Sequence, residues 1–143
     1  MSIHNIALVY LEEIENTYRT EMVDAEKEGD YYRMVALPFF AKNLAIGDLI
    51  AVEDEDGVHY FDDLIKKSGR STVRILFWNE GIINKTLEKL KLLGAVVFTL
   101  PEVTKYVALD IPAEIDYSPI QEFLKTGKLN QSWDFDEACL GWK

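Results

Sequence analysis

The densest group of side chains capable of chemistry lies in the segment EDEDGVHYFDD, residues 53–63. It holds six carboxylates in eleven positions, and carboxylate oxygens are ligands that calcium prefers. Three residues match the third, fifth and sixth places of the EF-hand calcium loop: Asp54, Asp56 and Gly57. However, Val52 stands at the first ligand position, and Asp63 rather than Glu stands at the last. We therefore expect no metal here, and favour a solvated turn or an electrostatic patch for a basic partner.

The remaining reactive side chains form no catalytic or zinc-binding pattern. His4 and His59 belong to no HxxxH or CxxH spacing. Cys139 follows Glu137 and Ala138, and neighbouring negative charge raises a thiol pKa instead of activating the thiol. The glycines form neither GxGxxG nor a P-loop, and no serine lies in a GxSxG motif. The sequence predicts no catalytic residue, no metal site and no cofactor, and we expect that the protein is not an enzyme.

The formal net charge is −10, from 25 acidic and 15 basic side chains. Residues 1–71 carry 15 acidic against 7 basic side chains, a net −8, whereas residues 72–143 carry 10 against 8, a net −2. A negative field repels phosphate backbones and anionic membranes and attracts basic partners. We therefore expect a basic protein partner, and neither nucleic acid nor membrane. The alternative, that the acidity serves solubility alone, stays open.

Aromatic residues near these carboxylates suggest a binding face. In an extended strand, one residue of each adjacent pair, Tyr31-Tyr32 and Tyr60-Phe61, must point away from the core. Exposed aromatic rings beside carboxylates can anchor a protein interface, although a second buried layer would also explain them. The predicted partner-binding residues are Glu53, Asp54, Glu55, Asp56, Tyr60, Asp62 and Asp63.

The chain length of 143 residues suits one compact unit with a sizeable apolar core. We predict a β-rich acidic lobe over residues 1–70 packed on a second lobe over residues 71–143. No apolar run is long enough to span a bilayer, and the first residues lack the basic start and cleavage site of a signal peptide. These features favour a cytoplasmic protein, and we expect a monomer or a weak dimer.

The second half has the clearer pattern of elements. Apolar residues recur at helical spacing over residues 83–93 and stop at Gly94. A second helix is indicated by Ser118 at the N-cap, Pro119 at the first helical position and Gly127 as the C-terminal stop. The predicted strands cover residues 71–78, 95–100, 105–111 and 129–136. The resulting order β-α-β-β-α-β is that of a ferredoxin-like lobe.

The first half predicts antiparallel β-hairpins or a small barrel-like lobe. Residues 6–10 suit a strand, but the apolar spacing over residues 11–28 also fits one face of a helix, so that stretch stays open. Residues 18–37 can form two strands around Gly29, and residues 49–65 form a hairpin around Asp56-Gly57, a strong turn signal. The predicted fold class is α+β.

The block LPFFAKNLAIGD, residues 37–48, joins these two hairpins. Pro38 ends the preceding strand, and Gly47-Asp48 turns the chain into the next one. The apolar residues between them extend over roughly two helical turns. We predict that Phe39, Phe40, Leu44 and Ile46 act mainly as a core plug.

Three blocks resemble a bacterial family with a domain of unknown function: LPFFAKNLAIGD at 37–48, KSGRSTVRI at 67–75, with SGRSTVR at its centre, and WDFDEACL at 133–140. The resemblance covers about residues 20–140 and implies a small α+β protein without established catalytic residues. Members are also similar in size and acidity to immunity proteins that protect bacteria from toxins of contact-dependent growth inhibition. The expected function is neutralisation of a basic, nuclease-type toxin by protein–protein contact. The alternative is a small-molecule-sensing or regulatory domain.

Overall fold

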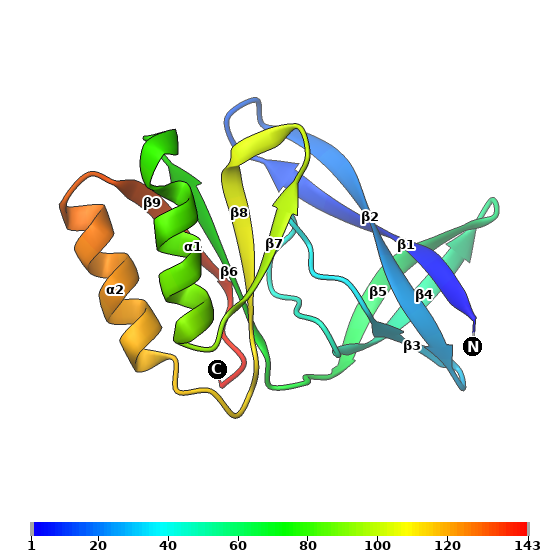
Figure 1. Cartoon of the computed structure of the whole chain (residues 1–143). Coiled ribbons are helices and arrows are strands. Elements are labelled where there is room, and N and C mark those ends of the chain that lie inside the picture. The colour runs from blue at the N-terminus through cyan, green and yellow to red at the C-terminus, as the bar shows by residue number, and fades with distance from the viewer. Residues whose placement is uncertain (1, 143) are drawn as a thin grey trace.

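In the computed structural model, which describes residues 2–142, the first five strands close into a barrel and the last four form a separate sheet (Figure 1). The barrel strands are β1 (Ile3–Glu12), β2 (Thr17–Glu28), β3 (Tyr31–Met34), β4 (Leu49–Glu55) and β5 (Val58–Lys66). Two helices accompany the second sheet, so the predicted α+β class is confirmed. The outermost residues of the predicted lobes, 1 and 143, lie outside the described residues.

The long β1–β2 ribbon resolves the stretch that the sequence leaves open. β1 pairs with β2 along its whole length, from Ile3 opposite Glu26 to Glu12 opposite Thr17. Residues 11–12 and 17–28 therefore belong to strands, and residues 13–16 form the turn between them. The inward-facing side chains of the barrel and the loop beneath it form one core, which contains Ile6, Leu8, Val23, Ala25, Tyr32, Met34, Ala41, Leu44 and Ile50.

Both predicted hairpins are confirmed, and positive φ angles explain their turns. Asp56 and Gly57, with φ of 53° and 83°, join β4 to β5. Two consecutive positive φ values characterise the tight turn whose twist matches that of the flanking strands, and Asp-Gly is among its preferred sequences. Gly29, with φ of 64°, lies in the turn from β2 to β3.

The second sheet carries both helices on the face that lies away from the barrel (Figure 1). Its strands, β6 (Ser71–Phe77), β7 (Val96–Leu100), β8 (Val103–Ile111) and β9 (Trp133–Cys139), lie in the order β7-β8-β6-β9. All neighbouring pairs are antiparallel. A short 3₁₀ turn, η1 (Glu80–Ile82), precedes α1 (Ile83–Leu92), and α2 (Ser118–Leu129) precedes β9. Neither helix within residues 2–142 has the length and apolar character needed to cross a membrane.

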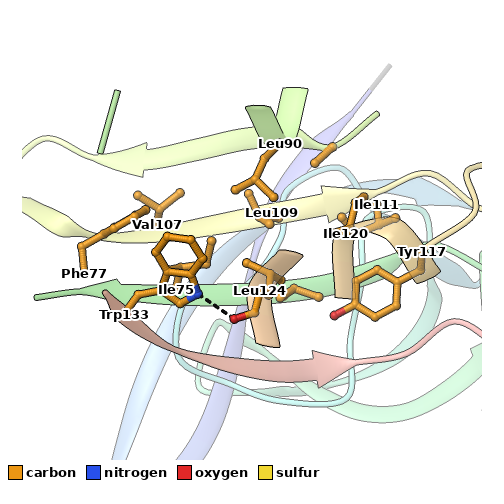
Figure 2. Packing of buried hydrophobic residues seen from close by; sticks show 12 residues of the cluster. Ile75, Phe77, Leu90, Val107, Leu109, Ile111, Tyr117, Ile120, Leu124 and Trp133 are labelled. Atoms are coloured by element: carbon orange, nitrogen blue, oxygen red, sulfur yellow. Dashed lines mark hydrogen bonds between the residues drawn. The ribbon is translucent and has the colours of Figure 1, made fainter. Parts of the chain in front are cut away.

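A second hydrophobic core fills the space between this sheet and its helices (Figure 2). Alternation along β6 directs Val73, Ile75 and Phe77 toward the helices, and all three are fully buried. The indole N–H of Trp133 is buried as well, and it donates to the carbonyl oxygen of Leu124 in α2 at 3.0 Å. The aromatic ring therefore fills the core without leaving its polar atom unpaired.

The boundaries predicted around α2 are partly wrong. Ser118 is not the N-cap: Tyr117 holds that position without a side-chain capping bond, and Asp116 accepts the Ser118 N–H instead. Gly127 does not end the helix, which continues to Leu129. A glycine is needed there for a different reason: a Cβ at this position would lie 1.9 Å from an indole carbon of Trp133. Since α2 continues to Leu129, β9 begins at Trp133 and not at residue 129.

The block at residues 37–48 forms an irregular loop between the barrel and the second sheet, not helical turns (Figure 1). The carboxylate of Glu21 accepts hydrogen bonds from the backbone N–H groups of Phe39, Phe40 and Ala41 at 2.6, 3.0 and 3.0 Å. A side chain therefore satisfies the donors that a helix would use internally. Leu44 is buried as predicted, but Phe40 is 46% exposed and is not a core plug.

Arginine and tyrosine side chains from the second sheet hold the other side of this loop. The guanidinium of Arg74 is buried and donates to the carbonyl oxygen of Ala41 at 2.8 Å and to Asp136 at 3.0 Å. The hydroxyl of Tyr106 donates to the carbonyl oxygen of Phe39. The loop is thus fixed from the barrel by Glu21 and from the sheet by these two residues.

Candidate partner-binding site

The predicted carboxylates all lie on the β4–β5 hairpin, whose turn is at the far end of the barrel from the second sheet (Figure 1). Each of them is exposed: Glu53, Asp54, Glu55, Asp56, Asp62 and Asp63. The turn of this hairpin is formed by Asp56 and Gly57, whose backbone geometry is fixed by their positive φ angles. The acids are therefore carried on a regular hairpin of a closed barrel, which limits the freedom they must lose on binding.

The pairing of β4 with β5 divides these side chains between two faces. Val52 lies opposite Phe61, and both pack against the barrel core. In the next pair, Glu53 lies opposite Tyr60, so alternation directs these two side chains outward. One pair further, Asp54 is directed back toward the end of the barrel interior. Alternation along the predicted strand implies this separation, and the packing of Val52 and Phe61 against the core shows which side faces the barrel interior.

The same alternation places two further acids with Glu53 and Tyr60. Glu55 pairs with Val58, and Asp63 pairs with Ala51, each on the outward side. Asp62 lies at a register shift, between the pairs formed by Phe61 and Asp63. We call the outward group the outer acidic face, and it consists of Glu53, Glu55, Tyr60 and Asp63.

None of the ion pairs described within residues 2–142 includes a residue of the outer acidic face. Between residues of the described range 2–142, six ion pairs form, and the one that includes a predicted acid joins Asp54 to His59. The lysine and arginine partners in the other pairs belong to acids elsewhere, such as Glu28 with Arg33. The outward carboxylates therefore present negative charge to the solvent.

The end of the barrel beside Asp54 holds a ring cluster that sequence reasoning missed. His4, Tyr32 and His59 lie with their ring centroids 5.3–5.6 Å apart. His59 contacts Asp54 through Nδ1, and His4 lies 2.7 Å from the hydroxyl of Ser2 through Nε2. No local spacing signals this cluster, because barrel closure brings the two histidines together. Asp54 is therefore engaged within the protein, unlike the outward acids.

Two observations concern metal binding and the reactivity of Cys139. Across residues 2–142, no group of three or more His, Cys, Asp or Glu side chains could hold a metal ion. Cys139 is buried, and burial, followed by the charge of Asp48, raises the pKa of its thiol. Glu137, the neighbour expected from the sequence to cause this shift, does not cause it: its carboxylate accepts hydrogen bonds from Tyr117 and Gln121.

Comparison with known proteins gives one family and one similar structure. A family model described as "Domain of unknown function (DUF4265)" matches residues 21–135. A crystal structure of a hypothetical protein from Neisseria gonorrhoeae is similar, with a TM-score of 0.86 and 24% sequence identity over 100% of this chain and 99% of that chain. This likeness concerns the fold. No curated protein matches the chain. The resemblance to a domain of unknown function over most of the sequence is therefore confirmed.

Proposed function

This chain belongs to the DUF4265 family, whose function is unknown, and from that premise we propose that it is a non-enzymatic immunity protein. Its target is a basic, nuclease-type bacterial toxin, which it neutralises by protein–protein contact. In this proposal the protein acts in the cytoplasm as a monomer or weak dimer.

The observation that carries this proposal is the outer acidic face. Glu53, Glu55 and Asp63 point outward from the β4–β5 hairpin, and none of the ion pairs described within residues 2–142 includes them. Such a face raises the rate at which a positively charged protein finds it, and it disfavours acidic partners. Tyr60 lies among these carboxylates, and a partly exposed tyrosine can anchor an interface at low entropic cost.

A nuclease is the fitting class of target because its substrate is a chain of phosphates. The basic side chains that bind this backbone are arranged to meet closely spaced negative charges. Adjacent carboxylates on the hairpin can occupy the same cations and so block access of nucleic acid. The mechanism therefore requires complementary charge and shape, without chemistry by the immunity protein.

Growth of bacteria that express the toxin tests this function. The reading frame next to this gene is expressed alone and together with the protein, and we expect growth arrest in the first case and growth in the second. The triple variant Glu53→Gln, Glu55→Gln and Asp63→Asn should lose protection. A matched triple variant, Glu88→Gln, Glu102→Gln and Glu122→Gln, has the same charge change on the second sheet and its helices, which we call the second layer, and it should keep protection. A neighbouring product that is harmless alone, or that stays toxic beside the wild-type protein, would contradict the proposal.

We also propose that the three sequence blocks mark this family because they form the junction between its two layers. Arg74 of SGRSTVR donates to Ala41 of LPFFAK and to Asp136 of WDFDEACL. Asn43 donates its N–H to the carbonyl oxygen of Ala138 at 2.8 Å, and Thr72 donates its hydroxyl to that of Leu44 at 2.9 Å. The match to the family model ends at residue 135, within the last block.

We also propose that the second sheet and its two helices form a ferredoxin-like lobe, since their elements follow the order β-α-β-β-α-β. The antiparallel strand order β7-β8-β6-β9 and the position of both helices on one face support this assignment (Figure 1).

A further inference from the structure

The barrel closes through a short seam that leaves one strand edge open. β1 and β5 pair in parallel at only two positions, Ile6 with His59 and Ala7 with Tyr60. β1 nevertheless continues to Glu12, and over residues 8–12 it is paired with β2 on its other side. Within the described residues, no backbone–backbone hydrogen bond outside the strand pairs involves residues 8–12. This stretch of β1 therefore has a free edge.

A groove with a volume of about 310 Å³ runs beside this free edge. One wall is β1 at residues 8–11, the opposite wall is the loop at residues 40–44, and Phe61 of β5 also lines it. The ring of Phe40 stacks on Tyr10 across the groove, with centroids 6.1 Å apart and planes 15° apart. Phe40 also stacks on Tyr106 of the second sheet, at 5.8 Å.

The loop wall is held in place from several sides, so the groove is preformed. Glu21 binds the N–H groups at residues 39–41, and Arg74 binds the carbonyl oxygen of Ala41. Further along, the carbonyl oxygen of Leu44 accepts the hydroxyl of Thr72. These bonds oppose collapse of the loop onto β1, and they reduce the ordering cost of binding a ligand.

The chemistry of the groove selects an extended polypeptide. A free strand edge presents backbone donors and acceptors at the spacing of another strand, and an added strand satisfies them along its length. The charges nearby select a basic one. Glu12 ends β1, Glu13 follows it and lines the groove, and Asp62 and Asp63 come directly after the groove-lining Phe61 of β5. Lys42 is the one cation among the described residues that line the groove.

We propose that the groove between β1 and residues 40–44 accepts an extended, basic segment of a protein partner as an added strand along residues 8–12. Backbone hydrogen bonds supply the attraction, the rings of Tyr10, Phe40 and Phe61 contact apolar side chains of the segment, and the acidic rim selects its charge. This goes beyond the proposed function, since the partner need not be a toxin.

Nuclear magnetic resonance of the isotope-labelled full chain tests this groove. The probe is the capped peptide KVKVKVK, and we expect saturable shifts of the backbone amides at residues 8–12 and 40–44. Two control peptides isolate the two sources of affinity: EVEVEVE reverses the charge, and KVKVKVK with alternate backbone nitrogens methylated cannot pair as a strand. Both should bind at least about tenfold more weakly. Shifts confined to the β4–β5 turn, equal binding of the methylated peptide, or no saturable binding would overturn the inference.

Variants of exposed residues separate the groove from the outer acidic face. Glu13→Lys with Asp62→Lys should weaken binding of KVKVKVK about tenfold, by charge repulsion at the rim. Glu53→Lys with Glu55→Lys changes the net charge equally and should weaken it much less. Equal loss in both variants would show that net charge alone attracts the peptide, and would overturn the inference. If the peptide binds but the protein does not protect growth, the proposed function is contradicted and the groove proposal stands. If the protein protects growth but the peptide does not bind, the groove proposal is contradicted and the proposed function stands.

Discussion

Arg74 of β6 donates a hydrogen bond from Nη1 to the backbone oxygen of Ala41, 2.8 Å away, and so ties the loop between the two layers to the second sheet. Its side chain is only 2% exposed, and among the described residues its Nε is a buried polar atom without a hydrogen-bond partner. Asp136, which pairs with Nη2, is 47% exposed and can be solvated. The contribution of Arg74 therefore depends mainly on the buried oxygen that it satisfies.

Replacing Arg74 with Met should destabilise the protein by about 2–4 kcal/mol, because Met keeps much of the volume but leaves a buried carbonyl oxygen unpaired. Urea denaturation gives the free energy of unfolding. The matched control is Arg19→Met, which removes the exposed pair with Glu15 and should cost less than about 0.5 kcal/mol. An equal decrease in the free energy of unfolding in the two variants would show that the contact of Arg74 with the loop stabilises the protein no more than a surface ion pair does.

We propose that the two layers unfold as one unit, because contacts from both reach the same loop. All three tryptophans, Trp78, Trp133 and Trp142, lie in residues 71–143, so their fluorescence reports on the second layer. Hydrogen exchange at amides of β1 and β2 reports on the barrel. We expect the free energy of unfolding from tryptophan fluorescence to equal that from hydrogen exchange at the most protected amides of β1 and β2. A barrel that opens at lower free energy than the second layer would contradict this.

Gly127→Ala should destabilise the protein although alanine is the better helix former. Residue 127 lies within α2, where alanine would normally add about 1 kcal/mol, but its Cβ would overlap the Trp133 ring. We expect a net loss of about 1–3 kcal/mol from this overpacking, measured by urea denaturation. The exposed Thr126→Ala in the same turn should change stability by less than about 0.5 kcal/mol.

The overlap itself can be tested by a second change. If overlap with the indole ring causes the loss of stability, Gly127→Ala should destabilise the protein much less in a Trp133→Leu background, where the indole ring is absent. A loss of the same size in both backgrounds would assign the effect to the helix backbone.

Stability should fall at alkaline pH, partly through Tyr106. Burial raises the pKa of its hydroxyl, an effect that the positive charge of Arg74 partly offsets. Below about pH 10, the ordinary pKa of tyrosine, the hydroxyl is protonated in both states and its contribution is fully present. As the pH rises, the unfolded chain loses the proton first, so the free energy of unfolding falls through the folded-state pKa.

Tyr106→Phe should therefore lose less stability than the wild type between about pH 8 and pH 10.5. Some alkaline loss should remain, because burial and a hydrogen bond to Glu137 also raise the pKa of Tyr117. Tyr18→Phe is the control, since Tyr18 is 73% exposed. Urea midpoints at both pH values measure the difference, and identical pH profiles for Tyr106→Phe and the wild type would contradict the assignment.

The local parts of this structure could be predicted from the sequence. The Asp56-Gly57 turn fixed one hairpin because few residues adopt two consecutive positive φ angles. The helix over residues 83–92 followed from its apolar spacing. Exposure of the hairpin acids followed from their charge, since carboxylates without partners avoid burial.

Most of the features that were missed depend on contacts between different elements. Closure of the barrel pairs Ile6 with His59, and no local pattern encodes that parallel seam. Gly127 resembled a helix stop because its role, space for Trp133, comes from a different element. In the site, barrel closure brings His4 next to His59 and Tyr32, which neither charge nor composition could show.

The most direct measurement of the central claim is the association rate of this protein with the purified product of the neighbouring reading frame, at low and at high salt. We predict fast association that slows with salt, and about tenfold slower association at low salt for the variant Glu53→Gln, Glu55→Gln, Asp63→Asn. The Glu88→Gln, Glu102→Gln, Glu122→Gln control should associate nearly as fast as the wild type. Equal rates for the two triple variants, or no complex with wild-type protein, would contradict recognition through the outer acidic face.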